Sequence, residues 1–276
     1  MIIKNENESM VLIVKQGERE TAFVIAKGKN GKNYVLKETV CSDILHVAEG
    51  NSKVGKHVLD FNLPIEYSCL HTCECYRNRA CYACSGCYQF PKNQAGYSEN
   101  YNFYKSCTTE EFCNALQIAI DKSQYKLFRY FTIGDIPDYR FIECMVRLAI
   151  ANPSVKFWSY TKKYTLVNMW IDENGSLPDN LVIIFSHWLN DNGSYFPMDN
   201  KHNLPVSEFI PLGQEERAET VTHICPCSDP TKKATCETCD HPCYELKHGE
   251  SMALLEHSTQ RTKARDKAIK QAHDAL

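Results

Sequence analysis

Short apolar stretches alternate with polar turns over residues 10–40. The stretches read MVLIVK, TAFVIAKG and NYVLKE, and the last two are separated by a turn rich in glycine, lysine and asparagine. Strand-length apolar runs divided by such turns are typical of consecutive antiparallel strands. We therefore predict an N-terminal antiparallel β meander, in a domain that covers residues 1–54.

The pattern changes to alternating strands and helices after this segment. HVLDFNLPI predicts a strand, and SCTTEEFCNALQIAIDKS begins with a capping box, Thr108 to Glu111, ahead of apolar positions at helical spacing. Farther along, the pattern predicts a strand over 126–132, a helix over 138–151, a strand over 155–160 and a buried strand in LVIIFSHW. Because strands that alternate with helices favour βαβ units, we expect an α/β core with a parallel sheet over residues 55–257.

The segment SMALLEHSTQRTKARDKAIKQAHDAL ends the chain with mixed charge. We predict a terminal helix here, with residues 258–276 as a separate helical tail. Its basic stretch RTKARDKAIKQ fits either contact with nucleic-acid phosphates or a solvated amphipathic face, and we favour the second.

Composition places the chain among globular proteins that work inside a cell. It has 276 residues, of which 43% are hydrophobic and 24% charged, and its net charge of −3 gives no overall attraction to nucleic acid or anionic membrane. The N-terminus lacks a secretory signal, and no apolar run reaches the ~18 residues that span a bilayer. We expect a cytoplasmic protein with no membrane partner, and the pattern makes no prediction of its oligomeric state.

Two dense cysteine clusters are the strongest chemical signal. Residues 69–87 contain six cysteines and residues 225–243 contain five, out of fifteen in the chain. An odd number of cysteines without an export signal favours metal ligation over a disulfide framework. The candidate metal ligands are Cys69, Cys73, Cys75, Cys81, Cys84, Cys87, Cys225, Cys227, Cys236, Cys239 and Cys243.

The spacing favours iron–sulfur ligation and leaves zinc open. Cys236-x2-Cys239-x3-Cys243, after Cys225-Pro226, is similar to the irregular ligand runs of ferredoxins. Zinc more often takes evenly spaced Cys pairs or Cys/His pairs, and several histidines lie near the clusters. We expect one or two [4Fe–4S] clusters, the C-terminal one on Cys225, Cys236, Cys239 and Cys243, with Cys227 in reserve. Two further cysteines, Cys113 and Cys144, fall on apolar helical positions and are expected in the core.

Polar residues follow three predicted strands. The carboxyl ends of parallel strands meet at one edge, where α/β proteins bind ligands. We therefore take Asp135, Lys162 and His187 as candidate catalytic residues, and Gly134, Asp135 and Thr161 as candidate cofactor-binding residues. The alternatives are structural: a glycine turn, a helix cap by Asp135, Asp138 or Thr161, a solvated lysine and a hydrogen-bonded histidine.

Four stretches carry a resemblance to a known family. CYACSGCYQF, FRYFTIGDIPDY, NPSVKFWSYTKKY and CPCSDPTKKATCETCDHPCY resemble the phage-associated family called gene product eighty-eight, over roughly residues 55 to 257. Relatives of that family look like divergent radical S-adenosylmethionine barrels. The resemblance therefore implies a partial or complete parallel (β/α) barrel of radical-SAM-like type, iron–sulfur clusters and S-adenosylmethionine as a further cofactor.

One motif departs from that class. Radical S-adenosylmethionine enzymes typically use C-x3-C-x2-C, whereas here Cys69-x3-Cys73 is followed by Cys75 after a single residue. We expect an iron–sulfur protein of phage or mobile-element type, with radical chemistry on a small-molecule or nucleic-acid substrate left open. The alternatives are a nucleic-acid-binding protein whose metals are structural and a host-interaction protein without catalysis. The aromatic segment YSENYNFYK is expected to form a loop that covers the first cluster or stacks on bases.

Overall fold

The computed structural model describes residues 2–4, 9–16, 19–27, 33–40, 45–51, 53–73, 81–84, 86–188, 197–211, 221–228, 232 and 234–256. Its strands form two separate sheets, one of four strands and one of eight. The smaller sheet is the antiparallel meander expected near the N-terminus, with each strand paired to the next in the chain. Its strands are β1 (Ile2–Lys4), β2 (Ser9–Gln16), β3 (Arg19–Lys27) and β4 (Asn33–Val40).

The larger sheet is mostly parallel and has the order β11-β12-β10-β9-β8-β7-β6-β5. Among the described strands of this sheet only the β5–β6 pair is antiparallel, while β6 to β10 and then β12 and β11 all pair in parallel. Strands β5 and β11 form the two edges, so the described chain shows an open sheet and not a barrel. The strands are β5 (Val47–Asn51), β6 (Gly55–Phe61), β7 (Leu127–Tyr130), β8 (Lys156–Thr161), β9 (Leu181–His187), β10 (Val206–Ile210), β11 (His223–Ile224) and β12 (Ser251–Leu255).

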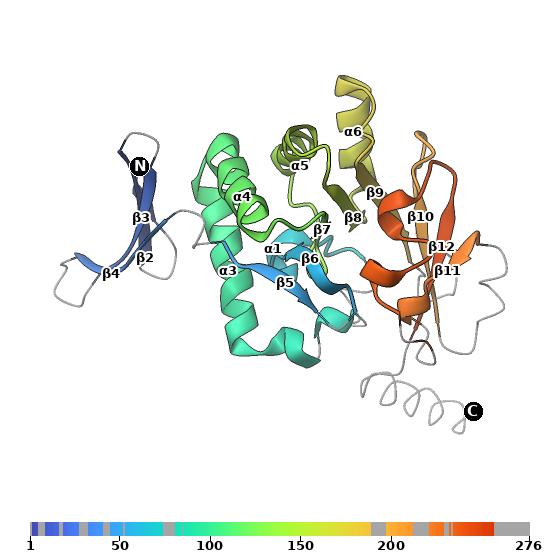
Figure 1. Ribbon diagram of the computed structural model, residues 1–276, viewed down its shortest axis with the longest axis horizontal. Coiled ribbons are helices and arrows are strands. Elements are labelled where there is room, and N and C mark those ends of the chain that lie inside the picture. The colour runs from blue at the N-terminus through green and yellow to red at the C-terminus, as the bar shows by residue number, and fades with distance from the viewer. Residues whose placement is uncertain are drawn as a thin grey trace.

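The helices cover one face of this sheet. Strands β6 to β9 are neighbours in sequence order and pair in parallel, so crossovers of the usual hand place their helices on the same side of the sheet. Figure 1 shows the helices grouped together. Phe128 and Phe157 from the strands meet Phe112 and Phe141 from the helices in the main core. The helices are α1 (Ile65–Ser68), α3 (Pro91–Ser106), α4 (Thr109–Ser123), α5 (Tyr139–Ala151) and α6 (Tyr164–Asn174).

The C-terminal cysteine segment covers the opposite face. Val58, Trp158 and Ile184 point to that side, where they form a second core with Cys225 and Cys243. Many of the cysteines lie in short 3₁₀ turns, which redirect the chain every few residues. These turns are η2 (Tyr82–Cys84) and η3 (Gly86–Gln89) in the first cluster, and η5 (Pro226–Ser228), η6 (Cys236–Thr238) and η7 (Cys243–Glu245) in the second.

Most elements predicted between residues 106 and 188 are confirmed. β7, α5, β8 and β9 lie where the pattern places them. The capping box at the start of α4 is also present: Thr108 Oγ1 accepts from the Glu111 amide at 3.2 Å, and the Glu111 carboxylate accepts from the Thr108 amide at 2.8 Å. Asp138 caps α5 by accepting from the Phe141 amide. Cys113 and Cys144 are buried in the helix-side core, as expected.

Two predicted secondary-structure elements were wrong. The segment YSENYNFYK is not a loop but part of α3, which begins at Pro91, a residue suited to the first helical turn, and buries Phe103 and Tyr104. Residues 251–255 do not begin a helix but form β12, because pairing with β10 and β11 buries Met252. The expected tail, 258–276, lies outside the described residues. Within the described part, no helix is both long and apolar enough to cross a membrane.

Candidate metal centre

The five cysteines of the C-terminal cluster line one cavity, although 3₁₀ turns and loops separate them in sequence. Two of them, Cys225 and Cys243, are buried, and the others are half-buried. Among the described residues no three Cys, His, Asp or Glu side chains are already arranged to hold a metal ion. The five cysteines therefore line the same cavity, but their side chains are not arranged in a metal-binding geometry. The cavity-lining cysteines are Cys225, Cys227, Cys236, Cys239 and Cys243.

Three of these sulfurs interact directly. The Cys227 thiol lies within hydrogen-bonding reach of both Cys225 and Cys236, and it lowers the pKa of Cys225 to about 6 and that of Cys236 to about 7. The same contacts raise the pKa of Cys227. The positive charge of Arg129 lowers the pKa of Cys225 and Cys236 further. Because the thiolate is the form that binds metals, these shifts favour Cys225 and Cys236 as ligands, whereas burial raises the pKa of Cys239 and raises that of Cys243 to about 12.

The sheet supplies polar groups next to the C-terminal cysteine cluster. Tyr160, on β8, donates its hydroxyl to the Cys243 sulfur at 2.8 Å. The Arg129 guanidinium, on β7, lies over the Tyr160 ring, 5.3 Å from its centroid. These residues are among those that the sequence reasoning missed. The sequence does contain a signal for Arg129: it is a charged residue between two aromatic residues, Phe128 and Tyr130, of a predicted strand.

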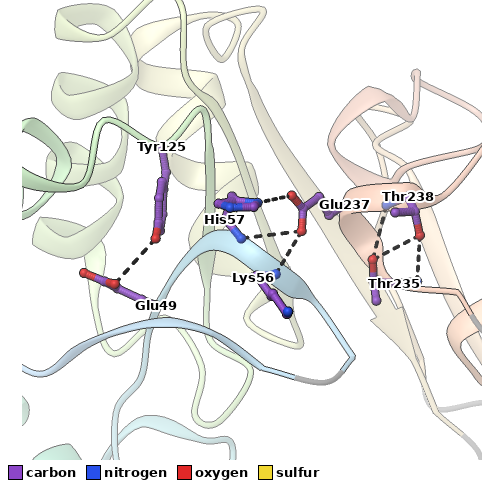
Figure 2. A network of polar contacts seen from close by, with 7 residues as sticks. All are labelled: Glu49, Lys56, His57, Tyr125, Thr235, Glu237 and Thr238. Atoms are coloured by element: carbon purple, nitrogen blue, oxygen red, sulfur yellow. Dashed lines mark hydrogen bonds and ion pairs between the residues drawn. The ribbon is translucent and has the colours of Figure 1, made fainter.

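Glu237 links the C-terminal cluster to the β5–β6 hairpin through hydrogen bonds. Its Oε2 atom accepts from the Lys56 amide at 2.8 Å, and its Oε1 atom lies 2.6 Å from His57 Nδ1 (Figure 2). The Cys236 amide adds a bond to the Lys53 carbonyl at 3.1 Å. Gly55 has φ +113°, and a Cβ atom there would lie 2.5 Å from Glu237. The β5–β6 hairpin and the C-terminal cysteine segment therefore fit closely.

Two histidines stand at the mouth of the cavity. The rings of His223 and His241 stack with centroids 4.3 Å apart, and both line the cysteine cavity. The same two residues also line a neighbouring polar cavity with Asp240 and Glu245. Nitrogen donors are thus available beside the sulfurs, so the zinc alternative keeps its physical basis.

The first cysteine cluster lies at the carboxyl edge of the parallel strands. Cys69 directly follows α1, and it packs with Cys81 and Cys84 against Ile133, in the segment after β7. The Tyr82 hydroxyl donates to the Thr132 carbonyl of the same segment. Cys73 is buried and Cys87 is exposed, while Cys75 falls outside the described residues. Four of the six predicted ligands therefore lie in one region, Cys69, Cys73, Cys81 and Cys84.

Charged strand-end residues face this first cluster. Burial raises the pKa of Cys69, the nearby Asp135 carboxylate raises it further, and the Lys162 ammonium opposes both. Burial also raises the pKa of Cys81, again against the effect of Lys162. Lys162 is thus close enough to stabilise negative charge on either sulfur.

Asp135 joins the ends of β7 and β8. Its Oδ1 atom accepts from Thr161 Oγ1 at 2.6 Å, and its Oδ2 atom accepts from the Lys162 amide at 3.0 Å. Its own amide donates to Ser68 Oγ at 3.1 Å. Asp135 is only 5% exposed, and this burial raises its pKa. The expected meeting of strand ends at one edge is therefore present at Asp135, Thr161 and Lys162.

The other strand-end candidates differ in their contacts and in how well the structure supports a role for them. Gly134 has φ +96°, and a Cβ atom there would lie 2.6 Å from the Leu63 carbonyl, so the turn requires glycine. Thr161 accepts from the Lys163 amide at 2.9 Å but is not the cap of α6, whose N-cap is Lys163; that prediction was wrong. Lys162 Nζ donates to Ser186 Oγ at 3.1 Å. His187 is half-buried at the end of β9, and its role stays a prediction.

Comparison with known proteins identifies a family. The family described as Gene product 88 matches residues 38–239, which is most of the chain and includes both cysteine clusters up to Cys239. The chain therefore belongs to this family. A search of curated proteins and a search of solved structures each found no significant match.

Proposed function

We propose that this member of the Gene product 88 family is a metal–sulfur protein in which each cysteine cluster binds an iron–sulfur cluster. The observation that carries the proposal is the cavity lined by five cysteines on the face of the sheet opposite the helices. Sulfur donors suit iron–sulfur clusters and zinc, and the irregular spacing favours the former.

The donor set fits a [4Fe–4S] cluster in the C-terminal cavity. Five thiols surround it and a cubane needs four, so the site can be closed by protein ligands. Cys227 lies within hydrogen-bonding reach of Cys225 and Cys236, but these contacts raise its own pKa, so we keep it as the reserve ligand. The guanidinium of Arg129 supplies positive charge next to an anionic group of thiolates. We assign this site a structural role, or one in electron transfer.

The first cluster has the better position for chemistry. It lies at the carboxyl edge of parallel strands, where ligands of α/β proteins bind, and Lys162 faces it. A cluster held there by three cysteines would supply an open iron to a small molecule such as S-adenosylmethionine. Lys162 would then hold a carboxylate of that molecule. Because the Asp135 carboxylate is occupied by Thr161 and the Lys162 amide, it would position Lys162 rather than move a proton.

The helices on one face and the C-terminal cysteine cluster on the other support the further proposal of a radical-SAM-like partial barrel. In that class of fold, parallel strands succeed one another around the barrel with helices outside. Strands β6 to β9 follow this order, with helices on a single side. We propose a phage-type enzyme of this kind in the cytoplasm of the host.

The test is anaerobic purification followed by iron, zinc and acid-labile sulfide analysis. We expect iron and sulfide together in the wild-type chain. The double variants C225S/C236S and C81S/C84S should each lose part of both, and C113A, in the helix-side core, should lose neither. Zinc without sulfide would contradict the iron–sulfur proposal, and no metal at all would contradict metal binding altogether.

Nucleic-acid binding with structural metals is the second candidate, favoured by one surface feature. The rings of Tyr67 and Tyr101 stack with centroids 4.9 Å apart, and Tyr67 is 61% exposed. Bases stack on such exposed aromatic side chains. Fluorescence anisotropy with a labelled single-stranded oligonucleotide decides the matter: binding that Y67A/Y101A abolishes supports this candidate, and no binding by the wild-type chain excludes it.

A further inference from the structure

We infer that the buried N–H groups of Arg129 and Trp158 are hydrogen-bond donors to the iron–sulfur cluster proposed for the C-terminal cavity. This inference rests on the proposed function and goes further, because it makes two residues of the sheet responsible for setting the reduction potential of that cluster. Both residues act through hydrogen bonds to the sulfurs of the cluster, and neither is one of its ligands.

Both residues have a buried nitrogen donor that lacks a hydrogen-bond partner. The Nε atom of Arg129 and the Nε1 atom of Trp158 are buried, and neither atom has a partner among the described residues. They are the two nitrogen donors among the unsatisfied buried side-chain atoms of this part of the chain. Because a buried N–H without an acceptor costs free energy, the two atoms indicate that an acceptor belongs next to them.

The two side chains are neighbours on one face of the sheet. Arg129 of β7 pairs with Trp158 of β8 in the parallel register, so both side chains point to the same face. Phe128 and Tyr130, which flank Arg129 in the sequence, pack in the helix-side core. Since side chains alternate along a strand, Arg129 and Trp158 point to the opposite face, which the C-terminal cysteine segment covers.

Both side chains also lie next to the residues that surround Cys243. Trp158 packs with Cys243 in the second core, and its ring centroid lies 5.2 Å from that of Tyr244. The Arg129 guanidinium lies 5.3 Å from the ring centroid of Tyr160, whose hydroxyl donates to the Cys243 sulfur. The two unsatisfied donors therefore adjoin the cysteine segment from the sheet side.

Sulfur is the acceptor that an occupied cavity would supply. A [4Fe–4S] cluster contains inorganic sulfides besides its cysteine sulfurs, and hydrogen bonds to these sulfurs help to set its reduction potential. Donors stabilise the more negative, reduced form of the cluster, so they raise the potential. A zinc ion with cysteine ligands has no inorganic sulfide and no reduction to adjust. The pair of donors therefore suits a redox cluster.

The experiment compares two variants that remove a donor with two matched controls. W158F removes the indole N–H, and R129K keeps the positive charge but has no N–H at the Nε position. W170F makes the first replacement in the helix-side core, and R147K makes the second at an exposed position of α5. Where far-ultraviolet circular dichroism shows that W158F does not fold, W158M replaces it.

The four variants are made in two full-length backgrounds, so that each signal belongs to one site. C81S/C84S retains the C-terminal site, and C225S/C236S retains the first site. The reduction potential and the rate of metal release into excess chelator are measured anaerobically in every protein.

In C81S/C84S we expect W158F and R129K each to shift the potential to more negative values. Each should also release metal about fivefold faster, because a hydrogen bond is worth about that factor. W170F and R147K should match the parent, and none of the four variants should change either quantity in C225S/C236S. No effect of W158F or of R129K, or equal effects of the controls, would overturn the inference. A wild-type chain without iron and sulfide would instead overturn the proposed function.

Discussion

The hydroxyl of Tyr160 donates a hydrogen bond to the sulfur of Cys243 across 2.8 Å, and this bond joins the central strand β8 to the last turn of the C-terminal cysteine cluster. Tyr130, on the neighbouring strand β7, provides the opposite case. Its hydroxyl is buried without a hydrogen-bond partner among the described residues. Comparing the two tyrosines therefore separates the stabilisation by a hydrogen-bonded buried hydroxyl from the destabilisation by an unsatisfied one.

Replacing Tyr160 by phenylalanine should lower the free energy of unfolding by about 1 kcal/mol, because a buried hydrogen bond is lost. Y130F should instead leave stability unchanged or raise it by about 1 kcal/mol, since it removes an unsatisfied buried group. Urea unfolding of the metal-bound chains measures both changes. A loss of stability in Y130F as large as in Y160F would contradict the assignment of the Tyr160–Cys243 bond.

Gly134→Ala should destabilise the fold by roughly 2–4 kcal/mol. The cost combines a left-handed backbone, φ +96°, with a Cβ atom 2.6 Å from the Leu63 carbonyl. Gly175 is the matched control, because its φ is +88° but a Cβ atom added there would meet no other atom within 4 Å. Thermal melting should show a clearly smaller loss for G175A. Equal losses would mean that backbone strain alone, and not the tight turn after β7, makes glycine necessary at position 134.

Removing the metal should lower the melting temperature substantially. The loops that contain the cysteines have little apolar area of their own, so the metal that we propose would contribute directly to folding. Differential scanning calorimetry under anaerobic conditions, before and after chelation, measures the change. If the two forms melt within a degree or two of each other, the idea that metal holds these loops in place is wrong.

Burial raises the pKa of Asp135, and this has a defined consequence for stability. A carboxyl whose pKa is higher in the folded state binds its proton more tightly there, so its stabilising effect is complete below the unfolded pKa and is lost as pH rises through the folded pKa. Wild-type stability relative to D135N should therefore fall as pH rises above about 4, the unfolded pKa of an aspartate.

Urea unfolding of the metal-free proteins at several pH values gives this difference. D172N is a suitable control, because hydrogen bonding from Lys201 lowers the pKa of Asp172 and reverses the sign. A difference between wild type and D135N that grows with pH would show that Asp135 is stabilised as an anion, contrary to its buried position.

Local sequence patterns predict the strands and helices between residues 106 and 188 because these elements have strong periodicity and clear caps. The Thr108–Glu111 box and the Asp138 cap are signals of neighbouring residues, and the structure contains both. The segment 251–255 escapes such patterns because its assignment as β12 depends on β10 and β11, which lie far away in sequence. Long-range pairing of this kind leaves no local pattern.

The cysteines of the candidate site stand out in the sequence, whereas their surroundings do not. Cysteine spacing alone indicates both clusters, and parallel strand ends indicate that Asp135, Thr161 and Lys162 meet. The placement of Arg129 beside the C-terminal cluster is not predictable, because it depends on which face of the sheet the C-terminal segment covers. That face is decided by the packing of Val58, Trp158 and Ile184 against the cysteine turns.

X-ray absorption at the iron and zinc edges of the anaerobically purified chain is the most direct test of the central claim. The account predicts iron surrounded by sulfur with further iron in the next shell, and a loss of part of this signal in C225S/C236S. Zinc bound by sulfur or by sulfur and nitrogen, with no neighbouring metal, would contradict it.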